Sequence, residues 1–269
     1  MSEERSELKV EPSGALPTRR ERVRASTVGE IKQTARRLLV AEGPAAISLR
    51  AIAREMGMTA PALYRYFASH EALIAALCEE LKLELLGELE RARDAVPPDR
   101  LLDRLYAVQR AFRGWAIAHR AEFALVFASV RPAEDGVPGT GDESKAAEAA
   151  QEAAQEAAYR FGAVFLELVV EIWQRTRFPL PEPEVMPAAL REQLERFATS
   201  VQPAAPVGLA YIYLTGWIRL YGMVALEVFG HLGFALTDVE PLFEAELSAF
   251  AATVGLTAGA APAPGGDQP

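Results

Sequence analysis

Apolar residues recur every three or four positions along most of this 269-residue chain, between repeated signals that start or stop helices. No segment sustains the alternation of apolar and polar residues that a half-buried strand requires. Half of the residues are apolar, so the chain can bury a sizeable core. The pattern predicts an all-α protein, with helices beyond residue 98 near 99–119, 121–130, 144–177, 184–199, 206–231 and 238–254.

Three helices and the start of a long fourth are predicted before residue 93. Thr27 and Glu30 form a T-x-x-E capping box, which places the start of the first helix. Gly57 ends the second helix, and Pro61 lies in the first turn of the third, where a missing N–H costs little. The other expected N-caps are Ser48, Thr59 and Ser69.

The stretch "GMTAPALYRYFASHEAL" (57–73) places three aromatic residues and an arginine on the short third helix. At about 100° per residue, this helix has an apolar face, a small and basic face, and two flanks. The apolar face holds Ala60, Leu63 and Phe67, the opposite face holds Pro61, Ala62 and Arg65, and the flanks hold Tyr64 and Tyr66.

This arrangement suits a helix that enters the major groove of DNA. Small residues let the backbone approach the bases, and Arg65 can donate two hydrogen bonds to guanine. The tyrosine hydroxyls can reach phosphates, and the helix N-termini at Ser48 and Thr59 suit phosphate as well. Alternatively, Tyr64 and Tyr66 are ordinary core aromatics. The pattern favours a helix-turn-helix.

Charge is distributed unevenly along the chain. The net charge is −9, yet residues 17–70 hold 10 Lys/Arg against 4 Asp/Glu, or +6. A basic module joined to an acidic body indicates binding to DNA or to a membrane surface. We expect a disordered N-terminal arm (1–24), a helix-turn-helix DNA-binding domain (25–72), a helical body (73–255) and a disordered tail (256–269).

The expected arm ends in the basic stretch "TRRERVRAS". Its arginines could follow the DNA backbone or enter the minor groove beside a half-site. The alternative is a solvated tail that contacts nothing. These arginines are Arg19, Arg20, Arg22 and Arg24.

Residues 27–73 resemble the DNA-binding domain of the tetracycline-repressor (TetR) family, through "IKQTARRLL" and "ISLRAIAREMGMTAPALYRYFASHEAL". One position departs, because His70 stands where the family usually has a phosphate-contacting lysine. That contact is therefore lost or depends on pH. The DNA-contact residues that we expect are Ser48, Arg50, Thr59, Ala60, Pro61, Ala62, Tyr64, Arg65, Tyr66 and His70.

A second resemblance covers part of the body. "LTGWIRLYGMVALEVFGHL" (214–232) and "AFRGWAIAHRAEFALVF" (111–127) are similar to the ligand-binding domain of a TetR subgroup with a Trp…His-Gly pattern. Trp217 and Gly222 match this pattern, whereas Tyr221 replaces the histidine. Arg120 stands where a proline is common.

The family resemblance implies a homodimer built on the last two long helices and a small-molecule pocket in the body. It therefore makes residues 73–255 a helical ligand-binding and dimerisation domain. The apolar helix at 206–231 needs cover on more than one side, and its glycines permit close helix contacts. Aromatic rings with a few polar tips suit such a pocket. The alternative is that these aromatic residues belong to an ordinary core. The expected lining is Phe112, Trp115, His119, Phe123, Phe127, Phe161, Phe165, Trp217 and Tyr221.

The chain shows no catalytic or metal-binding pattern, and we expect no enzyme activity and no cofactor. The charged start lacks a secretory signal, so we expect a cytoplasmic protein. Residues 207–225 are long enough for a membrane span, but the central Arg219 favours a buried helix. Cys78 is either a redox switch or a core residue.

Two functions remain open. The first is a transcriptional repressor released from a palindromic operator by a small hydrophobic effector. The second is a helix-turn-helix regulator without such an effector, controlled by a protein partner or by redox chemistry at Cys78. Release from DNA by a ligand would separate them.

Overall fold

The computed structural model of the protein describes residues 18–128, 160–201 and 205–256, and these residues form helices joined by turns and loops, with no strand among them. The predicted all-α fold class is confirmed. The predicted tail, the first part of the predicted helix at 144–177 and the start of the predicted arm lie outside the described residues.

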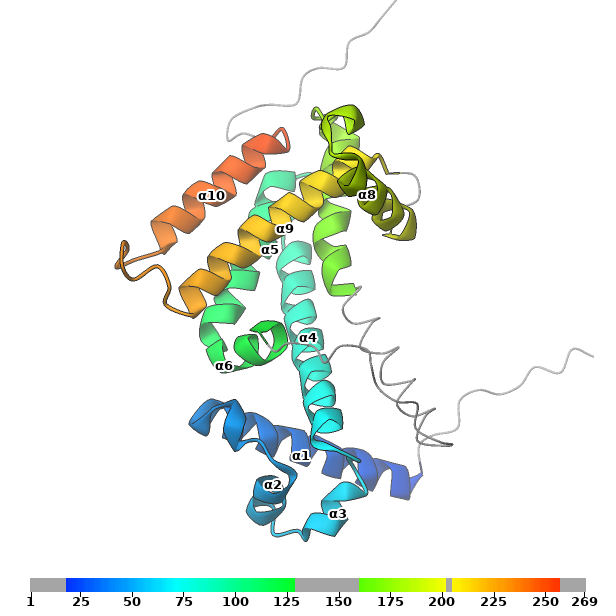
Figure 1. Cartoon of the computed structure of the whole chain (residues 1–269), viewed down its shortest axis with the longest axis vertical. Helices are drawn as coiled ribbons and strands as arrows, with labels where there is room; N and C mark the ends of the chain where they lie inside the picture. Colours follow the sequence, from blue (N-terminus) through cyan, green and yellow to red (C-terminus); the bar gives the residue numbers. More distant parts are fainter. Residues whose placement is uncertain (1–17, 129–159, 202–204, 257–269) are drawn as a thin grey trace, which may run out of the picture. The chain divides into compact units, whose positions relative to one another are not determined.

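The chain divides into two compact units, Met1–Leu73 and Ile74–Pro269. In the first unit, α1 (Arg19–Glu42) is followed by a 3-10 turn (Pro44–Ala46), α2 (Leu49–Glu55) and α3 (Ala60–Tyr64), as Figure 1 shows. Its core consists of apolar side chains that these helices and the turns between them direct inward. They are Ile31, Ala35, Leu39, Ile47, Leu49, Ile52, Ala53, Leu63 and Phe67, and Leu73 at the start of α4 (His70–Asp94) joins them.

The start of α1 corrects two expectations. The helix begins at Arg19 and not near Thr27, because Thr18 and Glu21 form an earlier T-x-x-E capping box. The Thr18 N–H donates to Glu21 Oε2 at 2.7 Å, and the Glu21 N–H donates to Thr18 Oγ1 at 3.3 Å. Thr27 lies inside the helix, and its hydroxyl donates to the carbonyl of Val23. The residues from 19 onward therefore belong to α1 and not to a disordered arm.

This earlier start has a local physical reason. Arginine is a good helix former, and no glycine or proline interrupts residues 19–28. Both capping boxes satisfy the same pattern, but only the upstream one leaves the intervening residues helical. The high charge of the arginine run suggests a disordered tail, but the helix propensity of arginine outweighs this effect.

Other helix boundaries agree with the capping signals. Ser48 Oγ accepts a hydrogen bond from the N–H of Ala51 at 3.1 Å, which confirms the predicted cap of α2. Gly57 adopts a positive φ of 65° directly after α2, a conformation in which glycine carries no steric penalty. Ser69 Oγ accepts from the N–H of Ala72, and α4 (His70–Asp94) follows.

In the second unit, the residues of α4 from Ile74 onward are followed by α5 (Leu101–Ala118), α6 (Arg120–Phe123) and a π-helical turn (Ala124–Ala128). A helix over 160–176 precedes a 3-10 turn (Pro183–Val185). The last helices are α8 (Ala188–Val201), α9 (Val207–Val228) and α10 (Glu240–Thr253). Figure 1 shows α9 crossing α5, with α8 and α10 beside it.

Two glycines of α9 let other segments approach closely. A Cβ on Gly216 would lie 2.6 Å from the ring of Phe250 in α10, and one on Gly208 would lie 2.8 Å from the carbonyl oxygen of Pro181. These contacts fix α9 within its own chain. Gly222 differs, because a Cβ added there would meet nothing within 4 Å.

An aspartate caps the start of α10. The residue directly before the helix is Val239, whose side chain makes no cap bond. Instead, Asp238 Oδ1 accepts a hydrogen bond from the N–H of Glu240 at 3.0 Å. A carboxylate at this position still satisfies one free N–H of the first turn.

Candidate DNA-binding surface and ligand site

The faces of α3 follow the helical spacing. Leu63 is fully buried and Phe67 is 7% exposed, so both belong to the core of the first unit. Ala60 is only half-buried. Pro61 and Arg65 lie on the other side of the helix, and Tyr64 lies beside them. All three are exposed, so a partner can reach them.

The helix itself is shorter than the predicted 60–67. α3 ends at Tyr64, and Arg65 is its C-cap, with φ −73° and ψ −15°. The Tyr66 and Phe67 N–H groups both donate to the Leu63 carbonyl, at 2.9 and 3.1 Å. The chain therefore turns once more, so Arg65 keeps a helical backbone conformation and stays exposed.

The two tyrosines occupy different environments. Tyr64 is 51% exposed, which excludes it from the core. Tyr66 is half-buried, and the guanidinium of Arg24 in α1 lies over its ring, 5.3 Å from the centroid. This cation–π contact places one of the arginines of the first helix beside the turn that follows α3.

The remaining DNA-contact candidates lie around α2 and α3. Thr59 is exposed and makes no side-chain cap bond, so its hydroxyl is available to a ligand. Ser48 uses its hydroxyl as a cap, which leaves its other lone pair and its proton. Arg50 and His70 are exposed, and His70 Nδ1 lies 3.8 Å from Glu71 Oε1.

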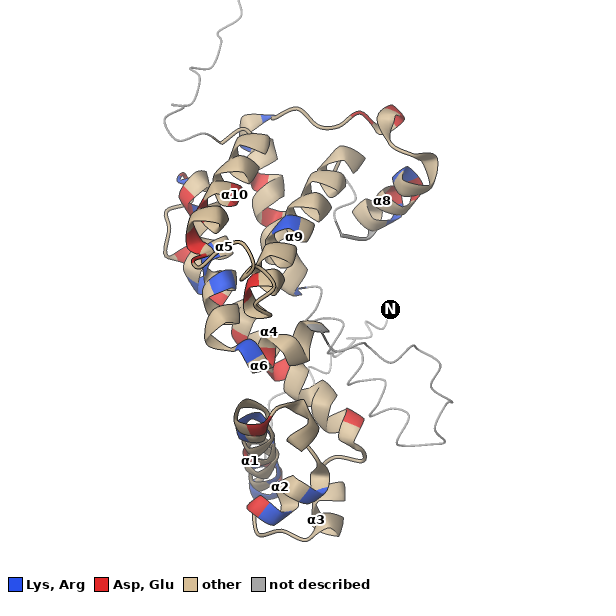
Figure 2. Ribbon diagram, turned by 60° about the vertical axis from the view of Figure 1, so that its left-hand side comes forward, with Lys and Arg blue, Asp and Glu red and all other residues tan. Residues whose placement is uncertain are grey.

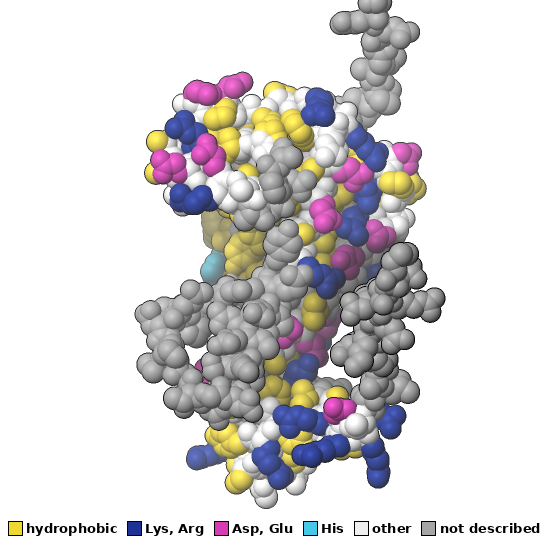
Figure 3. Space-filling view, turned by 90° about the vertical axis from the view of Figure 1, so that its right-hand side faces the viewer, with side chains coloured by type: hydrophobic (Ala, Val, Ile, Leu, Met, Phe, Trp, Pro, Cys, Tyr) yellow, Lys and Arg dark blue, Asp and Glu magenta, His cyan; other side chains and the backbone are white. Residues whose placement is uncertain are grey.

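Basic residues gather on the first unit. Figure 2 shows lysines and arginines along α1 and α2, and Figure 3 shows their side chains crowded on the surface of this unit. In the first turns of α1, four arginines are exposed: Arg19, Arg20, Arg22 and Arg24. Such a surface attracts the phosphates of a duplex.

In the second unit, aromatic rings from several segments form one contact cluster, which we call the aromatic cluster. Phe112 of α5 is fully buried and lies at its centre. Its ring centroid is 5.6 Å from that of Trp217 in α9 and 6.2 Å from that of Phe165. The Tyr221 hydroxyl donates to the Phe127 carbonyl at 3.4 Å. The aromatic cluster consists of Phe112, Phe123, Phe127, Phe161, Phe165, Trp217 and Tyr221, and Phe229 contacts it at the ring of Phe123.

Two expected lining residues belong elsewhere. Trp115 donates its indole N–H to Glu84 Oε1 at 3.0 Å, and the ring of His119 stacks on it with centroids 5.0 Å apart. His119 Nδ1 lies 3.0 Å from the Trp115 carbonyl oxygen. No ring contact joins these two residues to the aromatic cluster among the described residues. No local pattern points to Glu84 as a partner, because it lies about 30 residues away on α4.

Cys78 has the surroundings of a structural thiol. It is half-buried, and its Sγ lies 3.8 Å from the Leu125 carbonyl oxygen. Burial raises the pKa of this thiol above its usual value, with a smaller opposing effect from Lys82. A raised pKa leaves less thiolate at neutral pH, which disfavours a redox switch.

The first unit places α2, the turn at Gly57 and the short helix α3 in sequence, on a surface rich in arginine. This arrangement is that of a helix-turn-helix DNA-binding protein. Residues 31–77 match the family described as bacterial regulatory proteins, tetR family, and residues 105–250 match the Tetracyclin repressor-like C-terminal domain. The chain belongs to the TetR family of transcriptional regulators.

Curated relatives carry the same description. The chain is 30% identical over 230 residues to the HTH-type transcriptional regulators Mb1846 of Mycobacterium bovis and Rv1816 of Mycobacterium tuberculosis. Each comparison covers 85% of this chain and 92% of the relative. This protein is therefore a DNA-binding regulator and not an enzyme, as predicted.

Solved structures share the fold. The crystal structure of the regulatory protein SCO4313 is 27% identical, with a TM-score of 0.64, and covers 87% of this chain and 98% of its own. A bacterial regulatory protein of the tetR family from Rhodococcus RHA1 is 16% identical, with a TM-score of 0.54, and covers 86% and 98%. The second likeness concerns the fold alone.

Among the described residues, α9 has the length and composition of a membrane span. Core helices of soluble proteins also meet this description, and α9 packs within a helical body. This single helix does not make the regulator a membrane protein.

Proposed function

We propose that this protein is a dimeric repressor that leaves a palindromic operator when a small hydrophobic effector binds at the aromatic cluster. The aromatic cluster is the observation that carries this proposal. It joins α5, the turn after α6, the helix at 160–176 and α9, so an occupant there would contact four separate segments. Aromatic walls with the hydroxyl and indole N–H of Tyr221 and Trp217 suit an apolar molecule with one or two polar groups.

The dimer surface is the exposed side of α9 and α10. Leu214, Ile218 and Leu226 of α9 are 37%, 59% and 43% exposed, and they recur at helical spacing. Leu242 of α10 is 39% exposed. Gly222 lies between these α9 residues and leaves room for another backbone to approach. A second copy would bury this apolar surface, as members of the family do when they dimerise.

Two copies present two recognition segments. Because a two-fold axis relates the copies, we expect half-site centres about one helical turn of DNA, roughly 34–36 Å, or a multiple apart. Arg65 would contact base edges, and the other exposed candidates around α2 and α3 would contact phosphates. The protein would act in the cytoplasm, where bacterial DNA lies.

The effector is tested by operator release. A chemically varied library of small hydrophobic molecules is added to the protein on labelled operator DNA, and fluorescence anisotropy reports release. We expect one or more compounds to release the wild type. Trp217→Leu should bind DNA normally and lose the response, because it removes a ring of the aromatic cluster.

Trp173→Leu is the matched control. Trp173 is half-buried outside the aromatic cluster, under the guanidinium of Arg177 at 4.4 Å, and this variant should respond like the wild type. If no compound releases the wild type while operator binding persists, the regulator without a small-molecule effector is the better description. Equal losses in both tryptophan variants would contradict the assignment of the site.

A further inference from the structure

Two arginines of α5 neutralise acidic residues on α9 and α10. Arg113 makes a bidentate pair with Glu227, at 2.8 and 2.7 Å, and its Nη1 lies 3.5 Å from Glu240 Oε2. Arg110 Nε donates to Glu244 Oε1 at 2.7 Å. These charges of the last two helices are therefore matched within the chain.

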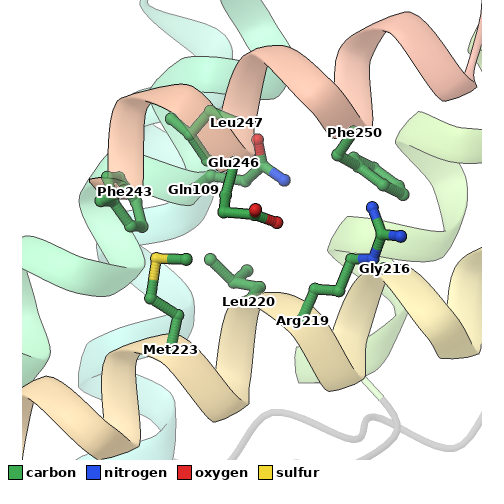
Figure 4. Close-up of a pocket in the computed structure, with 9 residues that line it drawn as sticks. All are labelled: Gln109, Gly216, Arg219, Leu220, Met223, Phe243, Glu246, Leu247 and Phe250. Atoms are coloured by element: carbon green, nitrogen blue, oxygen red, sulfur yellow. The ribbon is translucent and has the colours of Figure 1, made fainter. Parts of the chain in front are cut away.

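Arg219 of α9 and Glu246 of α10 are the charged residues of these helices that remain. Neither makes an ion pair or a hydrogen bond with another residue in the part of the chain that the structure describes. Arg219 is exposed and Glu246 is half-buried. Both point into the space between α9 and α10 in Figure 4. They have opposite signs and share the face that we assign to the dimer.

The space between them is a pocket. Apolar side chains such as Met223 and Phe250 line this open hollow. Gln109 of α5 also lines it. Gln109 is 4% exposed, and its Oε1 has no hydrogen-bond donor among the described residues. The pocket thus holds a carboxylate and a buried acceptor that both lack a donor.

A guanidinium group fits these requirements. It carries five N–H donors in a planar fork, so it can donate two parallel hydrogen bonds to a carboxylate such as that of Glu246. Its alkyl stem can lie along apolar walls. An isologous interface places residue i of one copy against residue j of the other and repeats the contact in reverse. Unpaired charges of opposite sign on one face are therefore complementary to the same face of a second copy.

We propose that Arg219 of each protomer enters the α9–α10 pocket of the other protomer and pairs there with its Glu246. This inference rests on the dimer of the proposed function and adds the residues that select the partner and its register. The exposed apolar residues supply affinity, whereas a like charge brought into this pocket would be costly. The rival arrangement is a pair between Arg219 and Glu246 of the same chain.

Mixing two single variants separates these arrangements. Arg219→Glu and Glu246→Arg each bring like charges together in a homodimer, and we expect each dissociation constant to rise by at least about tenfold. In a mixed dimer, both interchain pairs join opposite charges. One pair is the wild-type Arg219 and Glu246, and the other pair is formed by the two substituted side chains. Both within-chain pairs of the mixed dimer join like charges. Native mass spectrometry of the mixture should therefore show the mixed dimer in at least about tenfold excess over either homodimer.

The controls are Arg196→Glu and Glu192→Arg, two exposed charges on α8. Their mixture should give the statistical ratio of one to two to one. A monomeric wild type would contradict the proposed dimer and this inference together. A dimeric wild type whose single variants dimerise normally and mix statistically would overturn this inference alone.

Discussion

At the scale of single residues, Leu63 and Arg65 acquire opposite roles although only one residue separates them. Leu63 contributes to the core of the first unit, and its carbonyl accepts the N–H groups of Tyr66 and Phe67. The same turn leaves Arg65 exposed with a helical backbone. The core contact therefore fixes the backbone position of Arg65, whose side chain stays outside the core.

We predict that Arg65→Ala relaxes base preference at one position of each half-site by about 1–3 kcal/mol. A binding-site selection followed by titration of single-base variants measures this. Tyr64→Phe is the control, because it removes only an exposed hydroxyl. It should weaken binding to all sequences equally. An unchanged base preference in Arg65→Ala would show that this residue does not read bases.

A second prediction concerns Glu244. The hydrogen bond from Arg110, and then its positive charge, hold the pKa of this carboxyl below its ordinary value of 4.5. A carboxyl whose pKa is lowered by folding adds stability above its unfolded pKa and loses it as pH falls through its folded pKa. Glu244→Gln should therefore melt below the wild type at pH 7, and the two should converge as the pH falls below about 4.5.

Thermal unfolding across this pH range measures the effect. The expected effect at pH 7 is small, because Glu244 is 37% exposed and water screens the pair. If the difference in melting temperature between Glu244→Gln and the wild type grows as the pH falls, the predicted stabilisation by the Arg110–Glu244 pair is wrong.

At the scale of elements, α1 decides how the N-terminal arginines are presented. Because α1 begins at Arg19, the arginines have fixed directions on a helix. Arg20 and Arg24 are four residues apart and share a face, and Arg24 lies over Tyr66. Arg22 projects from a different face. The basic surface beside α3 is therefore part of a folded helix.

We predict that replacing both Arg20 and Arg24 with glutamine weakens operator binding and flattens its salt dependence. Each lost phosphate contact should lower the slope of log affinity against log salt by about 0.9. Titrations at several salt concentrations measure this slope. Arg22→Gln removes one charge from the other face and should leave the slope nearly unchanged. If each arginine lowers the salt slope by the same amount, the face of α1 on which it lies does not determine whether it contacts DNA.

At the scale of the whole molecule, the last two helices carry both the internal packing and the exposed apolar face. Gly216 brings α9 against Phe250 on one side. Ile218, two residues later, is 59% exposed. A helix of this kind stabilises its own chain with one side and leaves the other exposed, and this exposed side is the proposed dimer surface.

We predict that the wild type melts at a temperature that rises with protein concentration, because dimerisation stabilises the folded chain by mass action. Ile218→Asp should give a monomer with a lower melting temperature that no longer depends on concentration. Val185→Asp is the control, because Val185 is 76% exposed on the turn before α8. Sedimentation at micromolar concentration checks the mass. A monomeric wild type would contradict the proposed dimer.

The helical class, the caps at Ser48 and Ser69 and the inward direction of Leu63 and Phe67 could all be predicted from the order of residues alone. These features depend on residues within one helical turn of each other, so spacing and side-chain type suffice. Local signals failed where two were equivalent. The boxes at Thr18 and Thr27 satisfy the same pattern, and the early start of α1 depends on the helix formers between them.

Which distant side chains meet became apparent only in the folded chain. Packing joined Phe112 to Trp217, diverted Trp115 to Glu84, and matched the arginines of α5 with acidic residues more than 100 positions away. It also left Arg219 and Glu246 without partners in the described part of the chain. Such pairings depend on how whole helices pack, because two helices that cross bring together residues that no local period relates.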